Sequence, residues 1–250
     1  MHRFFIDQKI DIGDLIYLKD DDYNHLKNSL RIRINENIEI SDGKNNVFEC
    51  SVKEFCRDYC IISINNRMET DNEPICDITL YAAVLKGDRF ESLIQKCIET
   101  GVNLIIPVIT SNTIVDLDEK KKNKKADRWN KVARLACMQS KRGKLIVVNE
   151  PVMLNEAICV TKINHDSDYI SLVCYEAEKE NSIKKFLMQA VKMGIKKINI
   201  FIGPEGGFKK FEIENMNKAG ILSAHLGKRI LRADTAAVQA VFYTAAFYEL

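Results

Sequence analysis

The sequence predicts an α/β protein in two parts, a small β-barrel followed by a parallel sheet with helices on both faces. Residues 1–70 contain short apolar stretches separated by turn residues such as Ser41-Asp42-Gly43, a pattern typical of a barrel of short strands. From residue 75 onward, continuous apolar strands alternate with helical segments. Such strands are buried on both faces, and their alternation with helices is typical of a parallel sheet. We therefore expect domains at residues 1–70 and 75–250.

Four strands are expected in the first part. Each is a short apolar stretch bounded by polar or turn residues, and they span Leu15–Leu18, Asn37–Ile40, Val47–Val52 and Tyr59–Ile64. The following segment, Asn66–Pro74, is polar and ends in a proline, so we place the linker there.

The second part alternates strands and helices. Residues Arg89–Gly101 predict a helix, because five apolar residues recur at helical spacing and a glycine closes the segment. Further helices are expected at 126–141, 182–193 and 209–220, and strands at 76–85, 103–109, 144–149, 169–176 and 196–202.

The composition indicates an ordinary globular chain, with 46% apolar and 29% charged residues. No apolar run approaches the ~20 residues that span a bilayer, and the N-terminal apolar stretch is too short for a signal peptide. We therefore expect a cytoplasmic protein. The eight cysteines contain no C-x-x-C pair and the four histidines are scattered, so we expect free thiols and no metal site.

The net charge of +2 hides an asymmetry along the chain. Residues 119–144 contain eleven Lys or Arg and two acidic residues, whereas residues 1–72 contain ten basic and fourteen acidic residues. A basic stripe beside a neutral or acidic body suggests a polyanionic partner. A solvated lysine-rich loop explains the run EKKKNKK equally well.

The most unusual local pattern is the loop Gly203-Pro204-Glu205-Gly206-Gly207, which directly follows the apolar run Ile200–Ile202. Glycine permits positive φ and lets a ligand approach the peptide groups. A helical pattern follows, so a helix N-terminus is expected to point at the loop. A glycine-rich loop by itself is more often a structural turn than a ligand site.

A second unusual loop lies in HLGKRILRADTAAVQAV. Regular structure is expected to end at Gly227, and the loop continues through Ile230-Leu231. The last helix is expected to begin at Asp234-Thr235, which are good N-cap residues. Ligands of parallel α/β sheets gather at the carboxyl ends of the strands. Two loops of this kind at adjacent strand ends predict a pocket.

These motifs resemble a known family. The segments KGDRFESLIQKCIETGVNLIIPVITSNT, RWNKVARLACMQSKRGKL, FIGPEGGF and LGKRILRADTAAVQAV, with MHRFF and NHLKNSLRIR, are similar to those of the bacterial small-subunit (16S) ribosomal RNA uridine-N3 methyltransferases. The resemblance covers essentially the whole chain. It implies an N-terminal PUA-like β-barrel and a C-terminal SPOUT methyltransferase domain with a trefoil knot, a rare topology that residue spacing alone does not show.

In that family the two loops wrap S-adenosylmethionine. The resemblance therefore implies a cofactor-binding role for Ile202, Gly203, Pro204, Glu205, Gly206, Gly207, Leu226, Gly227, Ile230, Leu231 and Thr235. Asp234 is a departure, because family members commonly have glutamate there, so the reach of this carboxylate differs. The dinucleotide-binding fingerprint is absent from the sequence.

The implied reaction needs little covalent catalysis, because a sulfonium methyl group is already an activated electrophile. The enzyme has to help remove the uridine N3 proton, and each pKa unit to be overcome costs about 1.4 kcal/mol. A cation near the uracil carbonyl oxygens stabilises the resulting anion. We assign that role to Arg232 first and Arg89 second. Glu205 and Asp234 are candidates to accept a proton or to orient an arginine, and these alternatives stay open.

The implied partner is ribosomal RNA in the small ribosomal subunit. His25, Arg31 and Arg33 match the family's basic entry motif, and Lys86, Lys141 and Arg142 are expected to line the path to the pocket. Contacts to phosphates make affinity fall with salt.

The last helix predicts a homodimer. Val238, Val241, Phe242, Ala245 and Ala246 share one face, and Tyr243, Phe247 and Tyr248 widen the apolar surface. A helix that is apolar nearly all round is buried on more than one side, and a partner subunit is the natural second side.

Other functions remain open at this point. The first alternative is a related knotted methyltransferase that acts on transfer RNA or on a ribose 2′-hydroxyl, which differs in the modified nucleoside. The second is a non-catalytic RNA-binding assembly factor, which loss of Arg232 or of the glycines would have favoured. A nucleotide-phosphate enzyme is disfavoured, because no Lys-Ser/Thr follows the glycine-rich loop.

Overall fold

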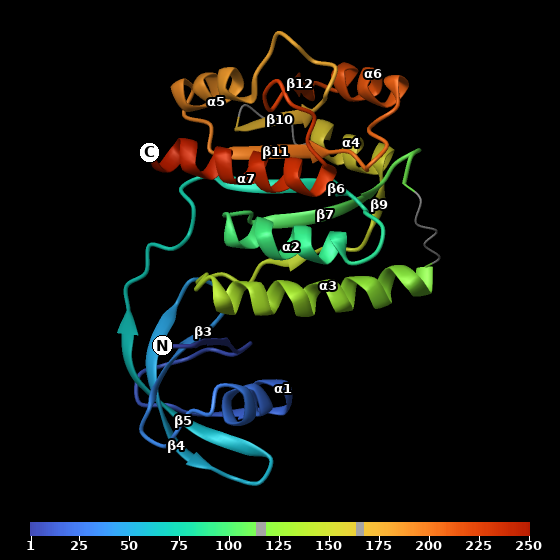
Figure 1. Cartoon of the computed structure of the whole chain (residues 1–250). Coiled ribbons are helices and arrows are strands. Elements are labelled where there is room, and N and C mark those ends of the chain that lie inside the picture. The colour runs from blue at the N-terminus through green and yellow to red at the C-terminus, as the bar shows by residue number, and fades with distance from the viewer. Residues whose placement is uncertain (114–118, 164–167) are drawn as a thin grey trace. The chain divides into compact units, whose positions relative to one another are not determined.

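The computed structural model describes residues 1–113, 119–163 and 168–250, which divide into two compact units (Figure 1). The first unit comprises Met1–Glu73 together with Cys137–Leu145, and the second comprises Pro74–Ala136 together with Ile146–Leu250. Residues 137–145 lie inside the range expected for the second domain, yet they group with the first unit.

The first unit is built on a curled five-stranded sheet. The strands are ordered β1-β3-β4-β5-β2, with β1 parallel to β3 and the other neighbours antiparallel. All four expected strands are present, as β2 (Leu15–Lys19), β3 (Asn37–Ser41), β4 (Val47–Phe55) and β5 (Tyr59–Met68). Strand β1 (Arg3–Phe5) was not expected. Residues of β2 alternate between exposed and buried, so one face of the strand forms the core of this unit.

One helical segment of the first unit was not expected. Helix α1 (Asp20–Asn24) runs directly into a π-helical turn, η1 (His25–Ser29). Three aspartates occupy the first turn of α1, where negative charge stabilises the helix dipole. Tyr23 and Leu26 are the buried residues of the two elements. Two apolar side chains within a polar stretch are too few for a periodic pattern, which explains why the sequence predicted only strands here.

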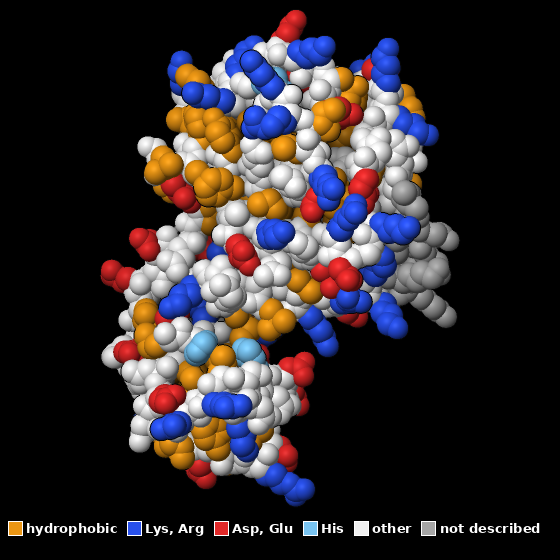
Figure 2. All heavy atoms as spheres, in the orientation of Figure 1, with side chains coloured by type: hydrophobic (Ala, Val, Ile, Leu, Met, Phe, Trp, Pro, Cys, Tyr) orange, Lys and Arg blue, Asp and Glu red, His pale blue; other side chains and the backbone are white. Residues whose placement is uncertain are grey.

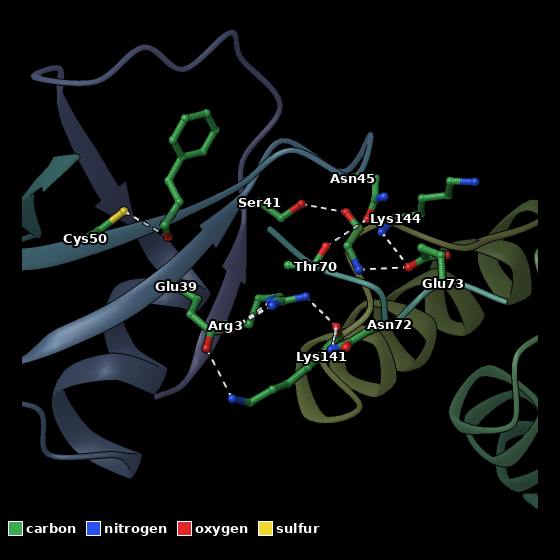
Figure 3. Close-up of polar contacts among 12 residues, drawn as sticks. Arg3, Glu39, Ser41, Asn45, Cys50, Thr70, Asn72, Glu73, Lys141 and Lys144 are labelled. Carbon is green, nitrogen blue, oxygen red and sulfur yellow. Dashed lines mark hydrogen bonds and ion pairs between the residues drawn. The ribbon is translucent and has the colours of Figure 1, made fainter. Parts of the chain in front are cut away.

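Buried ion pairs attach residues 137–145 to the first unit (Figure 3). The Arg3 guanidinium is paired with the Glu39 carboxylate at 2.8 Å and also donates to the carbonyl of Lys141. Glu73 is paired with Arg142 at 2.8 Å, and both side chains are nearly buried. The expected linker is therefore shorter than Asn66–Pro74, because β5 continues to Met68 and Glu73 is held by Arg142.

The second unit contains a parallel sheet in the order β12-β10-β11-β6-β7-β8, with β9 paired to β7. The parallel α/β architecture expected from the sequence is confirmed, and the knot stays a prediction. The strands are β6 (Asp77–Ala83), β7 (Leu104–Ile109), β8 (Val147–Val148), β9 (Val152–Met153), β10 (Tyr169–Cys174), β11 (Lys197–Ile202) and β12 (Leu222–Ala224).

Helices cover this sheet, and their bounds are α2 (Arg89–Glu99), α3 (Glu119–Gln139), α4 (Leu154–Ile163), α5 (Ile183–Lys192), α6 (Lys210–Lys218) and α7 (Ala233–Glu249). All five apolar residues that predicted α2 are buried. The sheet core includes a stacked pair, Tyr81 on β6 and Phe201 on β11, with ring centroids 4.3 Å apart.

Several elements of the second unit differ from the expectation, among them the short strand β9, which was not expected. Helix α3 begins at Glu119 rather than at residue 126, because lysine is a good helix former even without an apolar period. The strand expected at 144–149 is reduced to Val147–Val148, since Lys144 and Leu145 belong to the first unit. Helix α4 was not expected.

The cysteines are free thiols, and five of the eight are buried. This agrees with the expectation from their spacing. Among the helices described here, none is both long and apolar enough to cross a lipid bilayer.

Candidate functional site

A cavity of about 670 Å³ lies at the carboxyl ends of β10, β11 and β6, which are neighbours in the sheet of the second unit. Leu85 follows β6, Cys174 ends β10 and Ile202 ends β11, and all three line the cavity. This is the place where open α/β sheets bind ligands, and the volume suits a small molecule. The remaining lining comes from Arg89, Glu176, residues 203–208, residues 230–234 and Ala236.

The glycine-rich loop forms one wall of this cavity. The N–H of Gly207 donates to the carbonyl of Pro204 at 2.9 Å, which closes a tight turn. Gly207 has a φ of +66°, and a Cβ at this position would lie 2.9 Å from Oε1 of Glu176. The backbone conformation favours glycine here, and a Cβ would displace the Glu176 carboxylate.

Residues after β7 hold this loop in place. The side-chain amide of Asn112 donates to the carbonyls of Gly206 and Gly207, each at 3.1 Å. Glu212 is 4% exposed, and its carboxylate accepts the N–H of Ser111 at 2.9 Å and that of Lys209 at 2.8 Å. The loop is therefore fixed from both ends before any ligand binds.

The second predicted loop also lines the cavity. Ile230 and Leu231 line the main cavity, while Leu226 and Gly227 line a smaller adjoining cavity of about 100 Å³. Gly227 has a φ of +128°, a backbone conformation that side chains rarely permit. Ile230 is 86% exposed, so this wall of the cavity presents apolar surface to solvent.

Helix α7 begins at the cavity. Its N-cap is Arg232, whose backbone is extended, so the expectation that Asp234-Thr235 caps the helix was wrong. Asp234 instead lies in the first turn and lines the cavity, where its charge favours the helix dipole. Thr235, which was expected to bind the cofactor, is exposed and lines neither cavity.

The three expected catalytic residues lie together on the cavity wall. Nη1 of Arg89 is 3.4 Å from Oε1 of Glu205, and both side chains are partly exposed, so this ion pair is weak. Arg232 is exposed, and within the described residues its guanidinium has no hydrogen-bond or ion-pair partner. It is therefore available to a ligand.

Two further groups of the cavity were missed by sequence reasoning. Glu176, two residues after β10, places its carboxylate beside Gly207, and Cys174 is the last residue of that strand. Burial raises the pKa of the Cys174 thiol to about 12, so the thiol is neutral near pH 7. The rule that ligands bind at the carboxyl ends of parallel strands was the signal that could have found both residues.

The expected RNA-binding residues occur in both units. In the first unit Arg31 and Arg33 are exposed, and the ring of His25 makes an edge contact with Phe4 at 6.0 Å. In the second unit Lys86 is exposed and follows Leu85 of the cavity.

Lys141 and Arg142 have partners inside the first unit. Nζ of Lys141 is 3.2 Å from Glu39, and the lysine side chain is 45% exposed. The Arg142 side chain is 3% exposed and paired with Glu73. Because its guanidinium already serves this buried ion pair, we leave Arg142 out of the RNA-contacting set.

Comparison with known proteins adds to this geometry. A family described as RNA methyltransferase domain matches residues 71–245, and one described as RNA methyltransferase PUA domain matches residues 18–64. Ribosomal RNA small subunit methyltransferase E of Mesomycoplasma hyopneumoniae is 32% identical over 239 residues, which cover 95% of this chain and 96% of the relative. The protein of the same name from Bacillus subtilis is 27% identical over 248 residues, covering 96% and 94%.

Solved structures agree. The crystal structure of a ribosomal RNA small subunit methyltransferase E from Neisseria gonorrhoeae, bound to S-adenosyl methionine, has a TM-score of 0.88 and 29% identity, and covers 99% of this chain and 98% of that one. A putative methyltransferase from Legionella pneumophila with bound SAM has a TM-score of 0.87 and 27% identity, with coverage of 98% and 96%.

Fold and cavity thus define a two-part enzyme of the RNA methyltransferase class, with a PUA domain before the methyltransferase domain. Within that class, the chain belongs to the ribosomal RNA small subunit methyltransferase E family.

Proposed function

We propose that this protein transfers the methyl group of S-adenosylmethionine to N3 of one uridine in 16S ribosomal RNA of the small subunit. The observation that carries the proposal is that the glycine-rich loop and Ile230-Leu231 of the LGKRIL loop line one cavity at the carboxyl ends of parallel strands. Relatives with the small-subunit methyltransferase name, one of them solved with this cofactor, support it.

The cavity residues fit the proposed cofactor. Ile202, Pro204, Phe208 and Leu231 supply apolar surface for a purine ring. The turn at Gly206-Gly207 leaves peptide groups without side chains above them, which suits hydrogen bonds to a ribose or an amino acid part. Carboxylates at Glu176, Glu205 and Asp234 suit a ligand that carries a sulfonium and an ammonium charge.

Bound in this cavity, S-adenosylmethionine supplies an activated methyl group for transfer to a nucleophilic nitrogen. The residues of this chain have to orient the uracil and favour loss of its N3 proton. Arg232 is suited to the second task, because its guanidinium, which pairs with none of the described residues, can donate to a uracil carbonyl oxygen as negative charge develops there. Arg89 is second, since Glu205 already holds it at 3.4 Å. Glu205, Glu176 and Asp234 are the carboxylates that can accept the proton.

For the substrate, we propose contacts from His25, Arg31, Arg33 and Lys141 in the first unit and from Lys86, which follows Leu85 of the cavity, in the second. Except for His25 and Lys141, which are partly buried, these side chains are exposed. Reaction at N3 requires the base to leave its stacked or paired position, and this costs a few kcal/mol. The cytoplasmic location stays a prediction.

We further propose that the protein acts as a homodimer. Phe242 on α7 is 58% exposed, and Met188 and Val191 on α5 are 44% and 46% exposed. Helices α5 and α7 pack together, and Figure 2 shows apolar side chains gathered over them. Ile230 on the cavity wall is also exposed, so a partner subunit that contacts it would cover the cofactor site. Within α7, Phe242 lies apart from the buried face of Val241 and Ala245, a correction to the expected single face.

The experiment that tests the function uses labelled S-adenosylmethionine and small ribosomal subunits from a strain that lacks the enzyme. Digestion of the RNA and chromatography of the nucleosides should yield 3-methyluridine. A ribose-methylated nucleoside, or transfer only to transfer RNA, would favour the related knotted methyltransferases. No transfer to any RNA, despite cofactor binding, would favour an assembly factor.

A further inference from the structure

Helix α3 carries a basic face that the proposed mechanism does not use. Lys124, Arg128 and Lys131 are exposed and lie at positions i, i+4 and i+7, so they share one side of the helix. From Lys122 to Lys131 the sequence contains five Lys or Arg and one acidic residue, Asp127. Figure 2 shows Lys and Arg side chains gathered where α3 lies in the second unit.

No described residue neutralises the charges at two positions of this face. Lys124 and Lys131 have no ion-pair partner among the residues that the structure describes. A helix that is basic on its outer face and unpaired concentrates positive potential along its length. An extended polyanion is the ligand that suits such a row of charges.

The basic face also leads to the candidate active site. Nε of Arg128 is 2.7 Å from Oε1 of Glu91, and Nη2 of Arg128 is 3.7 Å from Oδ1 of Asp88. Asp88 directly precedes Arg89, which lines the cavity. Arg128 is 64% exposed despite these contacts. Arg128, the middle residue of the row Lys124, Arg128 and Lys131, therefore lies beside the first turn of α2, the turn that carries Arg89 of the cavity wall.

We propose that the exposed face of α3, defined by Lys124, Arg128 and Lys131, binds the phosphate backbone of the RNA substrate and guides it to the cavity. RNA is favoured over an acidic protein because the face leads to the cavity in which the base has to be placed. This inference rests on the proposed methylation of ribosomal RNA.

The test is the double variant Lys124→Gln/Lys131→Gln, which removes two charges and keeps two helix-compatible side chains. Its matched control is Lys196→Gln/Lys218→Gln. These exposed lysines precede β11 and end α6, so they lie at the amino edge of the sheet, away from the cavity. Measurements are filter binding of small-subunit ribosomal RNA against salt concentration, methyl transfer to small subunits, and calorimetric S-adenosylmethionine binding.

The expected result is a several-fold higher KM for small subunits in the α3 variant, with kcat and cofactor affinity unchanged. The slope of log K against log salt should become shallower by about 1.4 to 1.8, because each lost phosphate contact contributes about 0.7 to 0.9. The control should match the wild type in each measurement. An α3 variant with wild-type KM and salt slope overturns the inference while the proposed function stands, and so does an equal loss in the control. Wild-type protein that methylates no ribosomal RNA overturns the proposed function itself.

Discussion

Gly207→Ala is the change that most directly tests how the cofactor loop is built. At a φ of +66°, a residue with a Cβ costs roughly 1–2 kcal/mol relative to glycine. The new methyl group would also lie 2.9 Å from Oε1 of Glu176, so that carboxylate has to move. Because a carboxylate ends a flexible side chain, its movement adds little to the free energy of unfolding but displaces a charge from the cavity wall.

The neighbouring glycine provides a matched control. A Cβ at Gly206 would lie 3.5 Å from Cβ of Asn112, an ordinary contact, and its φ is not positive. We expect Gly206→Ala to change the free energy of unfolding by less than about 0.5 kcal/mol, as most substitutions without such features do. For Gly207→Ala, about 1–2 kcal/mol corresponds to a fall in Tm of roughly 2–8 °C for a domain of this size.

The assays are thermal unfolding and calorimetric titration with S-adenosylmethionine. Gly207→Ala should weaken cofactor binding well beyond Gly206→Ala, because it shifts Glu176 as well as the loop. In the double variant Gly207→Ala/Glu176→Ala the methyl group of Ala has no carboxylate to displace, so only the backbone contribution to the loss in free energy of unfolding should remain. Equal effects of the two alanine variants on both Tm and cofactor affinity would refute this account of the loop.

Three other predictions concern catalysis, assembly and pH. Arg232→Ala should lower the single-turnover rate of methyl transfer about a hundredfold while cofactor affinity stays within about twofold, and a near-normal rate would make this arginine structural only. Phe242→Glu should convert the dimer, seen in light scattering at twice 28.6 kDa, into the monomer. The control Val160→Glu changes another exposed residue, on α4, and should leave the dimer intact. A wild-type protein that is monomeric would contradict the dimer. Burial raises the pKa of several thiols above the ordinary 9.0, for example that of Cys60 to about 11, so the folded chain keeps protons that the unfolded chain loses. The free energy of unfolding in urea should therefore fall as pH rises above about 9, by about 1.4 kcal/mol per pH unit for each such thiol. Removing one buried thiol in Cys97→Ala should make this fall shallower. A free energy of unfolding that stays constant up to a pH of roughly 10.5 would be inconsistent with buried neutral thiols.

The glycine-rich loop could be predicted because its signal is local. A strand that ends in Gly203-Pro204 and continues into a helix has few other conformations available, and the rule on strand ends places it at a ligand site. The helical spacing of the apolar residues in α2 is also a local signal, and all the core residues that it predicts are buried. Both features follow from residues within one or two turns of each other.

The supports of the loop could not be predicted because they are distant in sequence. Asn112 lies 94 residues from Gly206, yet its amide fixes the carbonyl of that glycine. Glu176 comes from a third segment and limits what position 207 can hold. No period or motif links these residues, since only the parallel order of β10, β11, β6 and β7 brings their ends together.

Arg142 and Arg232 show why residue type alone does not assign a role. Arg142 directly follows Lys141, Arg232 follows Lys228-Arg229 after two apolar residues, and both were expected at functional positions. The fold brings Glu73 to within 2.8 Å of Arg142, and at 3% exposure this guanidinium can leave its carboxylate only by exposing a buried charge. Arg232 instead caps α7 at the cavity, where the described residues offer it no carboxylate partner. An arginine in a buried ion pair, such as Arg142, stabilises the fold and is not available to ligands. An arginine at the cavity without a carboxylate partner among the described residues, such as Arg232, can donate hydrogen bonds to the negative charge that develops during the reaction. What separates the two is the position of a single acidic side chain, and that position is a property of the tertiary structure.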